Sequence, residues 1–176
     1  MRWRTQGSRE RDVTLPEAAG FEAVVLPHLD AAYNLARWLV RDPSLAQDVV
    51  QDATLRGLTG FRGFRGGDGR AWLLRIVRNV AYDMLASRAA PASDETEAAD
   101  VPDPADTPEA ALLRQESLDQ LAAALAALPV ELRECLVLRE LEELSYKEIA
   151  QVTGQPIGTV MSRLWRARQA LLRGKG

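Results

Sequence analysis

The segment 89–108 constrains the fold of this 176-residue chain more than any other stretch, because nothing in it can pack into a core. It reads AAPASDETEAADVPDPADTP, with four prolines, six acidic residues and no basic residue, and it shows no apolar periodicity. Such a composition favours an extended, self-repelling linker. We therefore expect two helical units, at 17–88 and 109–174, preceded by a disordered tail at 1–16.

Both units are expected to be all-α. Alanine and leucine dominate them, aromatic residues make up only 6% of the chain, and β-branched runs are scarce. The only cysteine, Cys135, and the only histidine, His28, are too few for a disulfide or a zinc site. We expect a buried thiol, a surface or half-buried imidazole, and no metal or cofactor. The lack of a long apolar run or signal sequence predicts no membrane insertion and a cytoplasmic protein.

Start and stop signals divide the first unit into three or four helices. One is expected at about 17–40, and a second begins at Pro43 after an N-cap at Asp42. A glycine-rich stretch, TGFRGFRGGDG at 59–69, is expected to form a loop, and the third helix follows at 70–88.

The second unit is expected to contain four helices, at about 109–127, 129–140, 145–151 and from 156 onwards. Ser145 and Glu148 match the capping-box pattern, which marks the start of the short third helix. Gly154 is expected to supply a left-handed turn, and Pro156 to begin the last helix.

The stretch LSYKEIAQVTGQPIGTVMSRLWRARQAL at 144–171 has the plan of a helix-turn-helix. Four apolar residues predict the buried stripe of its second helix: Ile157, Val160, Leu164 and Leu171. The segment 156–176 has five basic residues and no acidic one, which suits duplex DNA. The candidate DNA-binding residues are Pro156, Thr159, Ser162, Arg163 and Arg166. Trp165 either packs on Met161 or lies beside the DNA backbone, and an ordinary helical hairpin with a solvated basic face is the alternative.

The stretch RAWLLRIVRNVAYDML at 70–85 offers a second nucleic-acid surface. Its expected core residues are Leu73, Ile76, Val77, Val80 and Met84. Another face carries groups suited to an unpaired strand. The aromatic ring can stack on a base, the guanidinium can contact phosphates, and the amide can hydrogen-bond to a base edge. The preceding loop can hold a base that has left the stack. The candidate residues for binding this strand, from the loop and the helix together, are Phe64, Arg65, Trp72, Arg75 and Asn79. Trp72 as an ordinary core residue is the alternative.

The stretch LAQDVVQDATL at 45–55 has an acidic outer face. Leu45, Val49 and Ala53 are expected to pack inward. The outer face carries Asp48, Gln51, Asp52 and Leu55. It is either solvated or a docking surface for a partner helix. Asp48 and Asp52 are the only pair of carboxylates spaced for two-metal hydrolysis, and no third ligand joins them, so we expect no enzymatic activity.

Taken together, these segments resemble the extracytoplasmic-function (ECF, group IV) sigma factors of bacterial RNA polymerase, over about 21–172. DPSLAQDVVQDATLRGL resembles region 2.2, GRAWLLRIVRNVAYDMLASR resembles regions 2.3–2.4, and GTVMSRLWRAR lies in a stretch that resembles region 4.2. Met161 and Trp165 stand where the family usually has more polar residues.

The resemblance implies an alternative sigma factor that directs core polymerase to specific promoters and promotes melting. It implies that Asp48, Gln51, Asp52 and Leu55 face the β′ clamp helices, that the second unit meets the β flap, and that the two nucleic-acid surfaces bind the −10 and −35 promoter elements. An anti-sigma factor is a further expected partner. A stand-alone helix-turn-helix regulator with a sensor or dimerisation domain is the competing hypothesis. The acidic linker is expected to keep the units apart, with nucleic-acid mimicry as the alternative.

Overall fold

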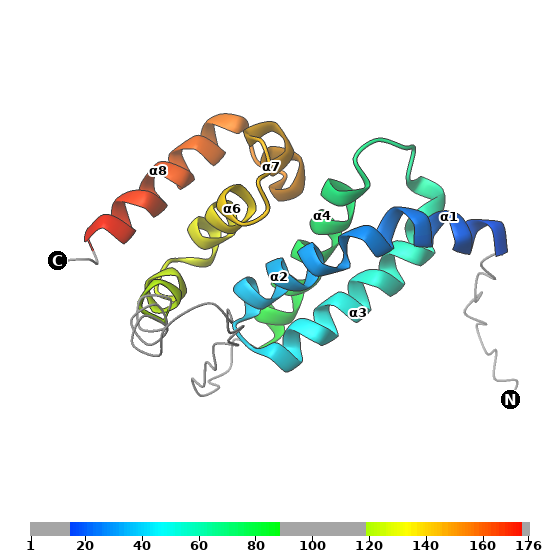
Figure 1. Ribbon diagram of the computed structural model, residues 1–176, viewed down its shortest axis with the longest axis horizontal. Coiled ribbons are helices and arrows are strands. Elements are labelled where there is room, and N and C mark those ends of the chain that lie inside the picture. Colours follow the sequence, from blue (N-terminus) through cyan, green and yellow to red (C-terminus); the bar gives the residue numbers. More distant parts are fainter. Residues whose placement is uncertain (1–14, 89–118, 174–176) are drawn as a thin grey trace, which may run out of the picture.

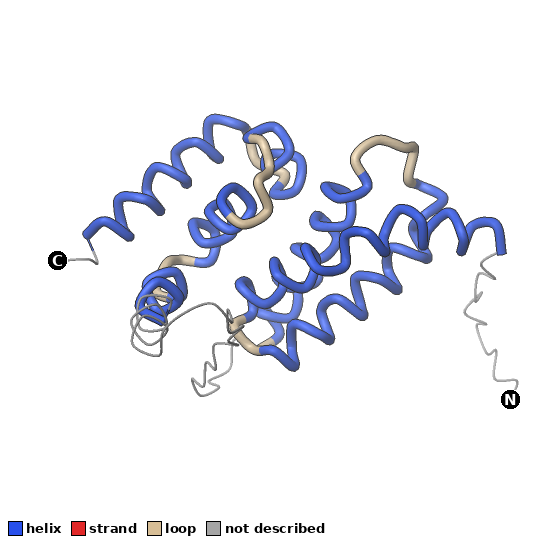
Figure 2. The backbone as a smooth tube through the Cα atoms, viewed as in Figure 1, coloured by secondary structure: helices blue, strands red, loops and turns tan. Residues whose placement is uncertain are grey.

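The computed structural model describes residues 15–88 and 119–173, all of which belong to helices or short connections (Figures 1 and 2). No strand occurs within these two ranges. The prediction of an all-α fold is confirmed.

The first unit is built from four α-helices and two 3₁₀ turns: α1 (Leu15–Val25), η1 (Leu26–His28), α2 (Leu29–Val40), α3 (Pro43–Gly60), η2 (Phe61–Gly63) and α4 (Gly69–Ser87). The single helix expected over 17–40 is interrupted at η1, which contains Pro27. Proline lacks the N–H and clashes with the preceding turn, so the chain tightens there instead of continuing as one α-helix.

Local caps set the starts of α3 and α4. The Asp42 carboxylate accepts a hydrogen bond from the Leu45 N–H at 3.0 Å, with Pro43 as the first helical residue, as predicted. Asp68 caps α4 in the same way, accepting from the N–H groups of Arg70 and Ala71.

The glycine-rich loop is shorter than predicted, because α3 continues to Gly60 and η2 follows it directly. Within α3, Gly57 is buried against two aromatic rings: a Cβ there would stand 3.1 Å from Phe21 and 3.5 Å from Trp72. Only 64–68 remain between η2 and α4, and within them Gly66 and Gly67 adopt positive φ.

The second unit contains helical residues at 119–126, followed by α6 (Val130–Glu140), α7 (Tyr146–Thr153) and α8 (Ile157–Arg173). The capping box of Ser145 and Glu148 forms in both directions, and Gly154 adopts φ 68°, as predicted. The predicted start at 109 lies outside the described residues.

Most predicted core positions are buried. Leu45, Val49, Ala53, Leu73, Val77, Val80, Val160 and Leu164 are all buried, and so is Cys135. Ile76, Met84 and Leu171 are half-buried, as is His28.

Ile157 was expected in the core, and this prediction is wrong, because 46% of the residue is exposed. The stripe of α8 that packs inward runs instead through Val160, Leu164 and Ala167 to half-buried Leu171. Their spacing of four, three and four residues keeps them on one face, and Ile157 stands at the edge of that face.

The two units pack against each other, α2 on α6 and α4 on α7, while α8 packs on α6 and α7 (Figure 1). The expectation that the units are held apart is therefore wrong for this conformation. Three charged residues of the second unit are buried: Arg133 and Glu134 on α6, and Glu142 just after it. We call these residues and their partners in the first unit the charged seam.

Candidate functional surfaces

The acidic face of α3 is open to solvent. Asp48 and Gln51 are exposed, Leu55 is 57% exposed, and Asp52 is half-buried. An exposed face of this kind is either solvated or able to dock a partner helix. All four predicted residues lie together on one helix face.

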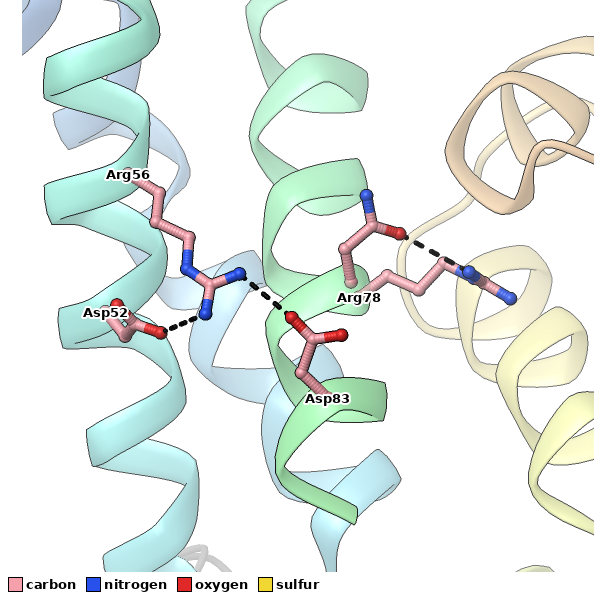
Figure 3. Close-up of polar contacts among 5 residues, drawn as sticks. Asp52, Arg56, Arg78 and Asp83 are labelled. Carbon is pink, nitrogen blue, oxygen red and sulfur yellow. Dashed lines mark hydrogen bonds and ion pairs between the residues drawn. The ribbon is translucent and has the colours of Figure 1, made fainter. Parts of the chain in front are cut away.

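Arg56 ties this face to α4. Its guanidinium pairs with Asp52 on α3 and with Asp83 on α4, each at 2.9 Å (Figure 3). Hydrogen bonds to Asp83 and then to Asp52 raise the pKa of Arg56. Because the three side chains are 35–63% exposed, the pairs add little stability, and their main effect is to orient the Asp52 carboxylate.

The loop before α4 is organised by stacked aromatic rings. Phe61 stacks on Phe64 with ring centroids 5.7 Å apart, and Phe64 lies 5.0 Å from the Trp72 ring. Phe21 meets Phe61 edge-on at 5.6 Å and joins this cluster to α1. Trp72 is half-buried and packs against the core, so it is not a fully buried core residue, and its contact with nucleic acid stays a prediction.

Two polar residues of α4, Arg75 and Asn79, are exposed on its outer side, and Arg65 is exposed in the loop. The Asn79 amide oxygen accepts a long hydrogen bond from Arg78 at 3.4 Å. The structure therefore brings aromatic, guanidinium and amide groups together along the loop and α4, as the sequence predicted.

The outer face of α8 is basic and open. Pro156, Ser162 and Arg166 are exposed and Thr159 is half-buried. The Ser162 hydroxyl donates to the Thr159 carbonyl at 2.9 Å, and Arg166 Nε donates to the Ser162 carbonyl at 3.4 Å. Met161 and Trp165 are also exposed, at 52% and 64%, so the fold does not use Trp165 as a core residue.

Arg163 differs from its neighbours on α8. It is half-buried, and its Nη1 atom is fully buried. Its positive charge faces the interior, where it lowers the pKa of Glu134 and of the Cys135 thiol and so opposes the effect of burial. Burial raises the pKa of Cys135 to about 11 despite this nearby cation, so the thiol is not a nucleophile at neutral pH.

No local sequence pattern predicted the charged seam, which joins α6 and the following Glu142 to α2 and α4. Arg78 Nε lies 2.5 Å from a Glu134 carboxylate oxygen, and the Tyr82 hydroxyl donates to the other oxygen at 3.2 Å. Burial raises the pKa of Glu134, and the nearby Arg78 opposes that rise. The available clue was a charged pair, Arg133 and Glu134, inside an otherwise apolar stretch of helix.

A second contact crosses between the units at Glu142. One carboxylate oxygen accepts from the Asn34 amide at 2.5 Å and the other from Arg70 at 2.5 Å. Arg133 also crosses, donating to the Leu39 carbonyl of α2 at 3.3 Å. Burial lowers the pKa of Arg133.

The described part of the chain contains no group of three or more His, Cys, Asp and Glu side chains placed to hold a metal ion. None of its helices is both long and apolar enough to cross a membrane.

Two family models match the chain. Residues 24–90 match Sigma-70 region 2, and residues 118–171 match Sigma-70, region 4. The match over 24–90 disfavours the alternative of a stand-alone regulator with a sensor domain in the first unit.

Curated proteins of known role are similar over most of the chain. The RNA polymerase sigma-H factor of Pseudomonas aeruginosa is 37% identical over 161 residues, which cover 86% of this chain and 83% of that protein. The ECF RNA polymerase sigma-E factor of Escherichia coli is 36% identical over 134 residues, covering 70% of each.

Solved structures share the arrangement of helices. The sigma factor RpoE from Bartonella quintana, in complex with the anti-sigma factor NepR, superposes with a TM-score of 0.72 at 27% identity and covers 88% of this chain and 96% of its own. CnrH in complex with the cytosolic domain of CnrY gives a TM-score of 0.64 at 25% identity, covering 90% and 91%.

Proposed function

This chain belongs to the ECF family of RNA polymerase sigma factors, and we propose how its surfaces divide the work of an alternative sigma factor. The first unit binds core polymerase and the −10 element, and the second binds the −35 element. The chain recognises the promoter and binds the melted DNA strand, while the polymerase catalyses RNA synthesis. The chain itself is therefore not an enzyme. This role places it in the cytoplasm.

The face of α3 docks on the clamp helices of the polymerase β′ subunit. Exposed Leu55 supplies the apolar contact, and Asp48, Gln51 and Asp52 supply charge and hydrogen bonds around it. The Arg56 bridge supports this role because it holds Asp52 in a fixed orientation before the partner arrives. The second unit docks on the β flap.

The loop and the outer side of α4 bind the −10 element as it opens. Phe64 and Trp72 offer ring surface to a base that has left the stack, and Arg65 and Arg75 follow the phosphates. Asn79 reads a base edge through its amide. The site favours the melted strand because Phe64 and Trp72 can stack only on bases that have left the duplex.

The outer face of α8 binds the −35 duplex. Pro156, Thr159 and Ser162 lie in the first half of the helix, which a recognition helix presents to the major groove. Arg166 contacts phosphate or a base edge. Arg163 is proposed to set the position of α8 from within, as its buried Nη1 indicates.

The similar solved structures support the proposal of one further partner for this chain. RpoE was solved in complex with the anti-sigma factor NepR, and CnrH in complex with the cytosolic domain of CnrY. We therefore propose that an anti-sigma protein controls this chain as well.

One observation carries the proposal: a single chain presents an open acidic face on α3 and an acid-free basic face on α8. The test is run-off transcription from a library of genomic fragments by sigma-free core polymerase with this chain added. Defined start sites are expected. Paired Asp48→Ala and Leu55→Ala changes should reduce core binding at least tenfold, and Arg166→Ala should weaken promoter binding while core binding stays unchanged. Failure to initiate on any template would refute the proposal.

A further inference from the structure

Helix α1 lies against both ends of the loop that is proposed to hold a base of the −10 element. We call this loop, residues 61–69, the −10 loop. It begins with η2, which α1 contacts, and it ends at the start of α4, which α1 also contacts (Figure 1). The match to Sigma-70 region 2 begins at residue 24, so Gly20 and Phe21 of α1 precede the matched segment. The family match therefore gives these two residues no role.

At the first end, Phe21 supports the aromatic cluster from the interior. It is 5% exposed, and its ring meets Phe61 edge-on with ring centroids 5.6 Å apart. Phe61 in turn contacts the two rings proposed to receive an unstacked base, Phe64 at 5.7 Å and Trp72 at 6.1 Å. A Cβ at Gly20 would stand 3.3 Å from the Phe61 ring, so the backbone of α1 also lies close to that ring. The positions of Phe64 and Trp72 therefore depend on α1 through Phe61.

At the second end, α1 meets Gly69, the first residue of α4. A Cβ at this position would stand 2.6 Å from the Val24 Cγ1 atom and 3.4 Å from the Val24 carbonyl oxygen. Carbon atoms in contact normally lie about 3.5–4.0 Å apart, so a side chain at residue 69 would push α1 away. The φ of Gly69 is not positive. Glycine is therefore needed here for the close approach of α1 and not for an unusual backbone conformation.

Between its two ends, the −10 loop has little support of its own. Residues 65–68 are exposed, and two glycines among them adopt φ values of 82° and 98°. Glycine loses more conformational entropy on ordering than any other residue, so such a segment is costly to hold in one shape. Hydrogen bonds fix both ends: the Phe64 N–H donates to the Phe61 carbonyl at 2.9 Å, and the Asp68 carboxylate accepts from the first N–H groups of α4. The shape of the loop is therefore set largely from its ends.

We propose that α1 is a support that holds the −10 loop in the shape that binds the melted strand, with Phe21 and Val24 as its positioning residues. Phe21 is buried, so it acts through Phe61, and Val24 acts through the start of α4. A loop that already has its bound shape loses less conformational entropy when a base enters, and it therefore binds the strand more tightly. The consequence for DNA rests on the proposed function, whereas the support of the loop is a property of the free chain.

Gly69→Ala tests the support directly, because the new methyl group must displace Val24 of α1. In the free chain, hydrogen exchange should speed up at least about tenfold at the N–H groups of Phe64, Arg70 and Ala71, which form the hydrogen bonds at the two ends of the loop. Exchange of the N–H groups in the middle of α2 and α3 should stay unchanged, because the support acts locally.

On DNA, the same variant should impair opening of the −10 element. The probe is a promoter fragment obtained from the run-off library, with 2-aminopurine placed in the −10 element, because the fluorescence of this base rises when it unstacks. With saturating core polymerase, Gly69→Ala should lower the equilibrium constant for opening roughly tenfold, since the loop must then be ordered when the strand binds. Core affinity should stay as in wild type, because the outer face of α3 is unchanged.

Removing the obstacle should restore the loop. Val24→Ala deletes the Cγ1 atom that the new methyl group meets, and the remaining atoms of residue 24 stand at 3.4 and 3.8 Å, an ordinary contact distance. Adding Val24→Ala to Gly69→Ala should therefore return both exchange and promoter opening to within about twofold of wild type. Gly60→Ala and Gly63→Ala are the matched controls, because an added Cβ at either position meets no other described residue within 4 Å, its chain neighbours aside. Both should behave as wild type.

If Gly69→Ala loses helix by circular dichroism, Phe21→Leu replaces it. Leucine keeps an apolar side chain in the core but removes the edge-on ring contact with Phe61. Exchange should then rise at Phe64 and not at the start of α4, and the equilibrium constant for promoter opening should fall about threefold.

The proposal is overturned if the folded variants leave exchange at the loop ends unchanged, if exchange rises equally throughout the first unit, or if Val24→Ala does not rescue Gly69→Ala. It is also overturned if a loosened loop opens the promoter as well as wild type does. Exchange is measured without polymerase, so it is independent of transcription. A chain whose loop responds as described but which initiates on no template would refute the proposed function and leave the support of the loop intact.

Discussion

The two helices proposed to read DNA are held in different ways. Helix α4 packs against α1, α2, α3 and α7, whereas α8 packs mainly against α6 and α7. A helix surrounded by others keeps a narrower accessible strip, here Arg75, Asn79 and Asp83, with Ala86 and Ser87 at its end. A helix held along one stripe exposes most of its surface. The comparison teaches that α4 is constrained by the fold at nearly every position, while α8 can change its recognition face with little effect on folding.

The largest expected effect concerns the single stripe that holds α8. Leu164→Ala should lower the free energy of unfolding by about 2–5 kcal/mol, since it leaves a cavity in that stripe. Because no second contact surface compensates, α8 should detach and −35 binding should be lost. Urea denaturation measures the loss of unfolding free energy, and hydrogen exchange along α8 measures its detachment. An α8 whose amides stay as protected as those of α4 would contradict the comparison.

The two tryptophans of these helices should behave in opposite ways. Trp72→Ala removes a half-buried ring from the aromatic cluster and should reduce stability by about 2–3 kcal/mol, somewhat less than a fully buried ring. Trp165→Ala, at an exposed position, should stay within about 0.5 kcal/mol of wild type. Thermal denaturation of both variants measures their losses of stability. Equal losses would show that α8 is as constrained as α4.

The smallest expected effect concerns base reading by the exposed apolar residues of α8. Thymine carries the one methyl group in the major groove, and Met161 and Trp165 can contact it. Replacing a contacted thymine by uracil should weaken binding by about 0.8 kcal/mol, or roughly fourfold. Titration of matched −35 duplexes measures the change. Met161→Ala should abolish the thymine preference, and Leu172→Ala, exposed near the end of the helix, should retain it.

Local chemistry made much of this fold predictable. Asp42, Ser145 and Gly154 act through their own backbone and the next few residues, so their roles were recognisable without tertiary information. The buried position of Cys135 followed from the apolar run around it. The outer face of α3 was predictable because helical period alone brings its four residues together, as the structure confirms.

The misjudged features depend on distant neighbours. Helix α3 continues to Gly60 and η2 follows it, where Phe61 packs edge-on against Phe21 of α1. Ile157 is exposed, whereas Val160, Leu164 and Ala167 of the same helix are buried against the rest of the second unit. Arg163 looked like its neighbours on the basic face, yet its inner atoms lie beside Glu134 and Cys135.

The sequence by itself determined the helices, most of their caps, the two units and the family, because these depend on period, composition and short motifs. Only the tertiary structure decided that the units close on each other through Glu134 and Glu142. The partners of these carboxylates, Arg78 and Arg70, are 56 and 72 residues away in sequence. Pairing across such distances depends on how whole helices pack, and no local pattern encodes it.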